Sequence, residues 1–92
     1  MIVRDARPED IAAWAAMRAQ LWPEVDAAEL ATDLPTMLDD PTLWNFILTD
    51  ANGQAVGFAE IQLRTMFDGC VVAPYPHIEG IWVEAAHRRT GA

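Results

Sequence analysis

A chain of 92 residues, 52% hydrophobic and 22% charged, is long enough for one globular domain, and this balance excludes disordered, collagen-like and disulfide-scaffold classes. Fourteen acidic residues against six arginines and no lysine give a net charge of -8, which disfavours nucleic acid and membrane surfaces as partners. No apolar run approaches the roughly 20 residues of a membrane span, no signal-peptide core is present, and the single Cys70 forms neither a disulfide nor a zinc site alone. We therefore expect a cytoplasmic protein that binds no metal.

The first half of the chain predicts one short strand followed by two helical stretches. Ile2–Arg4 is apolar and β-branched, as a strand requires. A helix is expected to begin at Pro8, which suits a first helical position, and to end before Trp22-Pro23, because the residue before a proline avoids the α region. A second helical stretch is expected over 26–39, kinked or divided into two short helices at Pro35.

The second half predicts an antiparallel meander. Trp44–Thr49 and Ala55–Arg64 are rich in strand formers and flank Asn52-Gly53, a strong hairpin signal. Thr65–Pro76 holds an Asp-Gly pair and two prolines, so we expect an irregular loop there. His77–Glu84 predicts a further strand. Helices that precede an antiparallel meander predict a mixed α+β domain.

The acidic residues are concentrated in one part of the chain. No basic residue lies between Ala19 and Leu63, whereas eight acidic residues do: Glu24, Asp26, Glu29, Asp33, Asp39, Asp40, Asp50 and Glu60. Such a pattern is typical of a solvated face that keeps a protein soluble, and it also suits a field that attracts a polycation. Composition alone favours the solvated face.

The end of the sequence carries the most informative motif. Arg88-Arg89-Thr90-Gly91-Ala92 follows an apolar strand. A glycine turn that leads to a helix N-terminus offers backbone N–H groups and a positive dipole end to a pyrophosphate, and arginines add charge-assisted contacts. Taken alone, an arginine pair with one glycine is more typical of an exposed turn.

In its context the motif resembles the acetyl-CoA motif of the GNAT N-acetyltransferases, in which an Arg or Gln precedes Gly by three positions and Gly or Ala by five. Arg88 and Gly91 match the first two fixed positions, and the third falls after Ala92. The segments Leu21-Trp22-Pro23, Val56-Gly57-Phe58-Ala59 and Glu79-Gly80-Ile81 are similar to the aminoglycoside 6'-N-acetyltransferases of that family. The resemblance covers the whole chain but only about half of such an enzyme.

The resemblance implies a single GNAT domain over residues 1–92, with a mostly antiparallel sheet and two helices, that stops after the phosphate-binding loop begins. It implies transfer of acetyl from acetyl-CoA to the 6'-amine of an aminoglycoside antibiotic, hence antibiotic resistance, by a homodimer. A GNAT enzyme acting on another amine and a non-catalytic GNAT-like fragment are the alternatives. Because aminoglycosides carry several positive charges, the acidic stretch gains a function under this interpretation.

Glu79 is the expected general base or amine-binding group, because an acceptor ammonium must lose a proton before it attacks a thioester. Strand alternation predicts that His77, Glu79, Ile81 and Val83 share one face, and His77 is the second choice for the base. From the residues alone, a carboxylate that only pairs with a neighbour is as plausible as a base. The resemblance favours the base.

The resemblance also assigns binding residues. Trp22, Met66 and Phe67 would line the aminosugar pocket with Glu79, whereas Trp14 fits the helical stripe and is expected in the core. The remaining assignments concern acetyl-CoA: the backbone of Ile81, Trp82 and Val83 would bind the pantetheine arm, with the Ile81 N–H polarising the thioester carbonyl, and Arg88, Arg89, Thr90, Gly91 and Ala92 would bind the pyrophosphate. Cys70 is expected to be a bystander.

Overall fold

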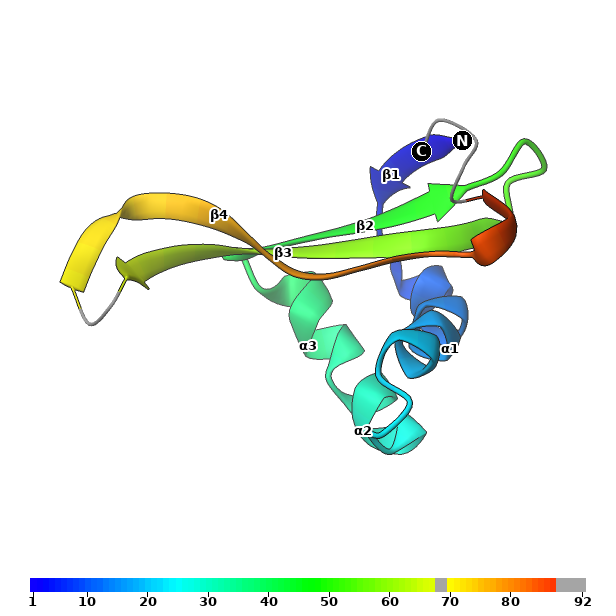
Figure 1. The fold of residues 1–92 in the computed structure, drawn as a ribbon, viewed down its shortest axis with the longest axis horizontal. Helices are drawn as coiled ribbons and strands as arrows, with labels where there is room; N and C mark the ends of the chain where they lie inside the picture. The colour runs from blue at the N-terminus through cyan, green and yellow to red at the C-terminus, as the bar shows by residue number, and fades with distance from the viewer. Residues whose placement is uncertain (68–69, 88–92) are drawn as a thin grey trace.

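A computed structural model describes residues 1–67 and 70–87, and the side chains of 65–67 and 70–74 lie outside the described part. Four strands form one antiparallel sheet in the order β1-β2-β3-β4, with helices on one face (Figure 1). The elements are β1 Ile2–Asp5, α1 Ile11–Leu21, α2 Ala27–Thr32, α3 Leu34–Asp39, β2 Leu43–Thr49, β3 Ala55–Phe67 and β4 Cys70–Val83, with short 3-10 turns at Pro8–Asp10 and Ala85–His87. The predicted α+β meander is confirmed.

The helices form where the sequence predicts them. Pro8 opens a 3-10 turn that leads into α1, and α1 ends just before Trp22-Pro23. The second stretch is divided in two: Asp26 caps α2 by accepting a hydrogen bond from the Ala28 N–H at 3.1 Å, and Pro35 lies in the first turn of α3, where its missing N–H costs no helical bond. None of the described helices has the length and apolar character needed to cross a membrane.

The expected loop over Thr65–Pro76 is wrong, because β3 continues into this segment and β4 begins within it. Pro76 is accommodated by its register. It pairs with Leu63, whose N–H is directed away from β4 to the Thr42 carbonyl at 2.7 Å. In such a non-hydrogen-bonded pair the Pro76 nitrogen faces the outer edge of the sheet, so the proline removes no ladder hydrogen bond.

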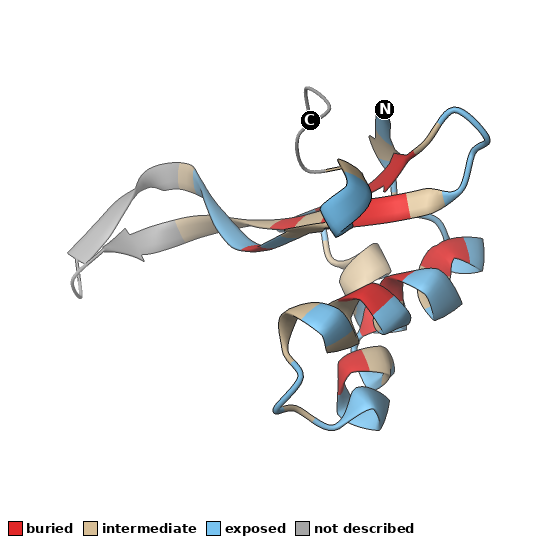
Figure 2. Cartoon of the chain, turned by 45° about the vertical axis from the view of Figure 1, so that its right-hand side comes forward, coloured by how far each residue is buried: buried red, intermediate tan, exposed pale blue. Residues whose placement is uncertain are grey.

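The hydrophobic core lies between the helices and the sheet (Figure 2). Its buried members come from α1, α3, β2 and β3: Trp14, Met17, Leu34, Ile47 and Phe58. Trp14 is 0% exposed, which confirms it as core. The opposite sheet face carries exposed apolar side chains, including Ile78 and Ile81. The hairpin signal at Asn52-Gly53 is also confirmed, since Gly53 has a φ of 80° and donates to the Asp50 carbonyl at 3.0 Å.

A buried carboxylate fixes the first strand to the first helical turn. Asp10 is 7% exposed and accepts hydrogen bonds from the Arg4 guanidinium at 2.7 and 2.8 Å and from the Arg7 backbone N–H at 2.8 Å. The hydrogen bonds from Arg4 and Arg7 hold the pKa of Asp10 below its usual range. Because Ile2 and Val3 are each 62% exposed, β1 depends on this clamp and on its pairing with β2.

Replacing Asp10 with Asn is expected to lower the free energy of unfolding by about 1–2 kcal/mol at neutral pH, since buried charge-assisted hydrogen bonds are lost. The lowered pKa of folded Asp10 means that its contribution is present above the pKa of the unfolded state and is lost as pH falls through the folded value. Urea unfolding followed by tryptophan fluorescence, at neutral and acidic pH, measures both effects. Glu9→Gln removes the same charge from an exposed neighbour, and equal losses in the two variants would contradict the clamp.

Candidate active site

A buried ion pair lies on the helix-covered face of the sheet. Glu60, on β3, is 2% exposed. The Arg18 Nε lies 2.9 Å from its Oε2, at an angle that makes this an ion-pair contact rather than a hydrogen bond, and the Arg18 Nη2 donates to Oε1 at 3.2 Å. The Trp14 Nε1 donates to Oε2 at 2.9 Å, and the Arg18 Nη1 donates to the Leu30 carbonyl at 2.7 Å. This network joins α1 to both β3 and α2.

Glu60 is electrostatically coupled to its surroundings. Burial raises the pKa of Glu60, and the positive charge of Arg18 and the hydrogen bond from Trp14 oppose this rise. The negative charge of Glu79 adds a smaller upward contribution to the pKa of Glu60. Glu79 therefore lies close enough for its charge to act on Glu60.

An acidic cavity of about 390 Å³ opens beside this pair. It is lined by Arg18, Asp33, Thr36, Met37, Asp40, Leu43, Glu60, Gln62 and Glu79. Arg18 is the one cation among these described residues, and Glu60 neutralises it. The carboxylates of Asp33, Asp40 and Glu79 therefore leave the cavity with a negative potential.

Asp40 is held in its charged form. Hydrogen bonds from the Thr42 hydroxyl at 2.7 Å and the Thr42 backbone N–H at 2.8 Å hold the pKa of Asp40 below its usual range. Asp33 and Asp40 belong to the acidic stretch of the sequence, and the fold brings them to the same cavity as Glu79. Part of that stretch therefore lines a cavity.

A β-bulge directs Glu79 to this cavity. Glu60 pairs with Gly80 while the next residue, Ile61, pairs with Ile78, so Glu79 is an extra residue in β4. An extra residue interrupts the alternation of side chains along a strand. Glu79 therefore lies on the same face as Glu60.

The expectation that His77, Glu79, Ile81 and Val83 share one face is wrong, because the bulge intervenes between Glu79 and Ile81. Ile81 pairs with Ala59 on the face without helices and is 55% exposed. His77 pairs with the cavity residue Gln62, but it is exposed and is not one of the side chains that line the cavity.

Glu79 has a partner that the sequence did not indicate. The Arg64 Nε and Nη2 donate to Glu79 Oε1 at 3.0 and 2.7 Å, and the two side chains are 41% and 31% exposed. Arg64 lies at the end of the predicted Ala55–Arg64 strand, and Glu79 lies on the next one. The expected loop between them concealed their cross-strand proximity.

Trp22 packs against the sheet. A Cβ at Gly80 would lie 2.7 Å from Cη2 of the Trp22 ring, whose centroid lies 6.3 Å from that of Phe58. The Arg18 guanidinium lies 5.2 Å from the centroid of the same ring, in a cation–π contact. Trp22 is half-buried and is not one of the described residues that line the acidic cavity. Glycine at position 80 permits this close approach.

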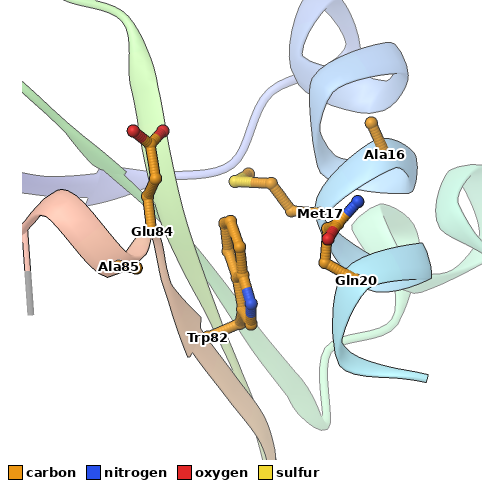
Figure 3. A pocket seen from close by; sticks show the side chains of 6 residues that line it. All are labelled: Ala16, Met17, Gln20, Trp82, Glu84 and Ala85. Carbon is orange, nitrogen blue, oxygen red and sulfur yellow. The ribbon is translucent and has the colours of Figure 1, made fainter. Parts of the chain in front are cut away.

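A second cavity, of about 590 Å³, lies between α1 and the end of β4 (Figure 3). Ala16, Met17, Gln20, Trp82, Glu84 and Ala85 line it. Met17 and Trp82 point toward one another from the two elements (Figure 3). Trp82 therefore contributes its indole to an apolar wall.

The backbone of β4 turns Ile81 toward the outer edge of the sheet. The Glu84 N–H donates to the Val56 carbonyl of β3 at 2.7 Å. Because N–H directions alternate along a strand, the Trp82 N–H also points to β3, and the Ile81 N–H points away from it. β4 is the last strand in the sheet order. The Ile81 N–H thus has the outward direction that the predicted donor needs. The Trp82 N–H, which was expected to contact the pantetheine arm, points to β3 instead.

Other predicted residues lie outside the described part of the chain. These are the side chains of Met66, Phe67 and Cys70 and the whole of Arg88, Arg89, Thr90, Gly91 and Ala92. Conversely, sequence reasoning missed Arg18 and Glu60 as a pair. Two signals were available in the sequence: Arg18 follows Trp14 at helical spacing, and Glu60 lies inside an apolar strand. A charged side chain needs a partner when it is buried.

No protein-family model matches the chain. The chain is 36% identical over 90 residues to an aminoglycoside N(6')-acetyltransferase type 1 of Stenotrophomonas maltophilia, covering 97% of this chain and 58% of that relative. A protein of the same name from Salmonella enteritidis is 36% identical over 93 residues, covering 99% of this chain and 63% of that relative. The solved structure of AAC(6')-Iy in complex with the bisubstrate analogue CoA-S-monomethyl-acetylneamine matches with a TM-score of 0.86 and 30% identity, covering 99% of this chain and 62% of that one.

The chain thus spans about three fifths of the length of the relatives that it matches. Within that span the similarity is nearly continuous, and the order of strands and helices agrees with the GNAT fold. By sequence and by fold, this segment is similar to aminoglycoside 6'-N-acetyltransferases, and its fold is that of the GNAT acetyltransferases.

Proposed function

We propose that this chain forms the acceptor side of an aminoglycoside 6'-N-acetyltransferase, which transfers acetyl from acetyl-CoA to the 6'-amine of an aminoglycoside. The observation that carries the proposal is the acidic cavity that gathers Asp33, Asp40 and Glu79 around a neutralised Arg18. An aminoglycoside presents several ammonium groups, and a cavity of this charge attracts them. The names of the relatives and the bisubstrate analogue bound by the solved neighbour support the same substrate class.

In this proposal Glu79 binds the acceptor ammonium and accepts its proton, directly or through a water. The amine can then attack the thioester carbonyl carbon, and the Ile81 N–H donates to the oxygen on which negative charge develops. As the carbonyl re-forms, the carbon–sulfur bond breaks, and CoA leaves as a thiolate that takes up a proton, so that the products are the acetamide and free CoA. The chain fits an acyl donor at this point, because the Ile81 N–H is directed to the outer edge of β4. Acetyl-CoA supplies the activated acetyl group.

The whole enzyme is proposed to be a cytoplasmic homodimer that confers antibiotic resistance, with residues 1–92 in its GNAT domain. A pyrophosphate-binding loop would begin at Arg88. Trp22, Met66 and Phe67 would contact the aminoglycoside, and His77 is the second choice for the base. The net charge of -8 supports the exclusion of nucleic acid and anionic membranes as partners.

The test is acetyl transfer to a panel of amines. The purified protein is assayed beside a chimera in which residues 1–92 replace the matching segment of the S. maltophilia relative. We expect acetylation of the 6'-amine of aminoglycosides in preference to a polyamine or a peptide N-terminus. Preference for one of the other amines would assign the chain to a different GNAT activity. A folded chimera that acetylates no amine, beside an active relative, would indicate a non-catalytic segment.

Glu79→Gln is expected to lower kcat by roughly a hundredfold or more, because it removes the proton acceptor and its charge while keeping the shape. The KM for acetyl-CoA should change less than about twofold, since the thioester contacts lie on β4 backbone. Steady-state kinetics from about pH 6 to 9 measures both parameters. Glu29→Gln, which neutralises an exposed acid on α2, is the control. Wild-type turnover across this range would rule out a base role for Glu79.

Asp33→Asn is expected to weaken aminoglycoside binding roughly threefold to tenfold at low ionic strength and to reduce its dependence on salt, because screened Coulomb attraction is lost. Titration calorimetry at about 0.02 M and about 0.3 M salt measures this. Asp39→Asn is the matched control, since Asp39 is an exposed acid that does not line the cavity. If both variants bind equally well, the acidic stretch acts only through net charge.

A further inference from the structure

Arg64 contacts Glu79 on one oxygen only. Both of its hydrogen bonds go to Oε1, and no donor among the described residues contacts Oε2. Glu79 lines the acidic cavity, whereas Arg64 is not one of its lining residues. The guanidinium therefore holds the carboxylate from outside the cavity and leaves one oxygen for a ligand inside it.

Glu79 needs such support because of its place in the strand. As the extra residue of the bulge, it has no cross-strand partner, and its neighbours pair on either side of it. Its side chain is 31% exposed, so the surrounding packing encloses it only in part, and a hydrogen-bond partner is needed to fix its rotamer. Arg64 belongs to the neighbouring strand β3, where it pairs in register with Tyr75, and it offers two donors in a fixed planar arrangement.

We propose that Arg64 is a positioning residue that orients the Glu79 carboxylate toward the acceptor amine. This inference rests on the proposed function. Arg64 could instead occupy the position of a substrate ammonium and compete with it. Its location outside the cavity lining favours positioning.

The direction of the kinetic effect on removing Arg64 distinguishes the positioning role from the competitor role. Removing the Arg64 cation makes the protein more negative, which by itself strengthens long-range attraction of a polycation. A competitor role predicts the same direction, since a rival cation is removed. Only a positioning role predicts a weaker reaction after the loss of Arg64.

The experiment compares acceptor kinetics of the aminoglycoside-active protein or chimera in four variants: Arg64→Met, Arg64→Lys, Glu79→Gln and the double variant Arg64→Met with Glu79→Gln. We expect Arg64→Met to lower kcat/KM for the acceptor roughly threefold to tenfold. The effect is modest because solvent partly screens the Arg64–Glu79 pair, whose side chains are 41% and 31% exposed. Arg64→Lys should restore part of this loss with its single ammonium. In the Glu79→Gln background, Arg64→Met should change kcat/KM by less than about twofold, because no proton acceptor remains to be oriented. The KM for acetyl-CoA should not move.

Arg7→Met is the control for charge. Arg7 is exposed, precedes α1 and is not one of the residues that line the acidic cavity. Thermal unfolding of each variant checks that folding is retained. Wild-type or higher kcat/KM in Arg64→Met would overturn the positioning role, and so would an equal loss in the presence and absence of Glu79. A wild-type protein and chimera that acetylate no aminoglycoside would overturn the proposed function itself, which is a separate outcome.

Discussion

The arrangement of this domain depends on one buried carboxyl group. Glu60 lies in the middle of an inner strand, where an unpartnered charge would cost several kcal/mol, and it is accommodated because α1 brings Trp14 and Arg18 to it. Arg18 in turn reaches the Leu30 carbonyl of α2 and the ring of Trp22. One ion pair thus sets how two helices lie on the sheet, and breaking it would leave a buried charge in their contact.

The same ion pair determines the character of the acidic cavity. A free arginine there would repel a cationic ligand, but Glu60 neutralises Arg18 and leaves Asp33, Asp40 and Glu79 to set the potential. The structural pair and the cavity-lining carboxylates are therefore parts of one charge distribution. The negative charge of Glu79 raises the pKa of Glu60, so the cavity and the buried pair are electrostatically connected.

The proposed chemistry is concentrated in three consecutive residues of β4. The bulge turns Glu79 to the cavity, and the strand beyond it directs the Ile81 N–H to the outer edge. Gly80, between them, permits the Trp22 ring to approach the backbone. A proton acceptor and a carbonyl-polarising donor can be this close because one extra residue changes the direction of side chains without ending the strand.

The element order, the helix break near Pro35, the hairpin at Asn52-Gly53 and the resemblance to GNAT enzymes could all be predicted before folding was considered, since they depend on local preferences and on short motifs. The sequence also indicated Glu79. The pairing of Arg18 with Glu60, the contact of Arg64 with Glu79 and the tolerance of Pro76 within a strand could not be predicted from local sequence. Each of these depends on cross-strand register or on burial between distant segments. A single inserted residue changes that register while leaving the local pattern intact.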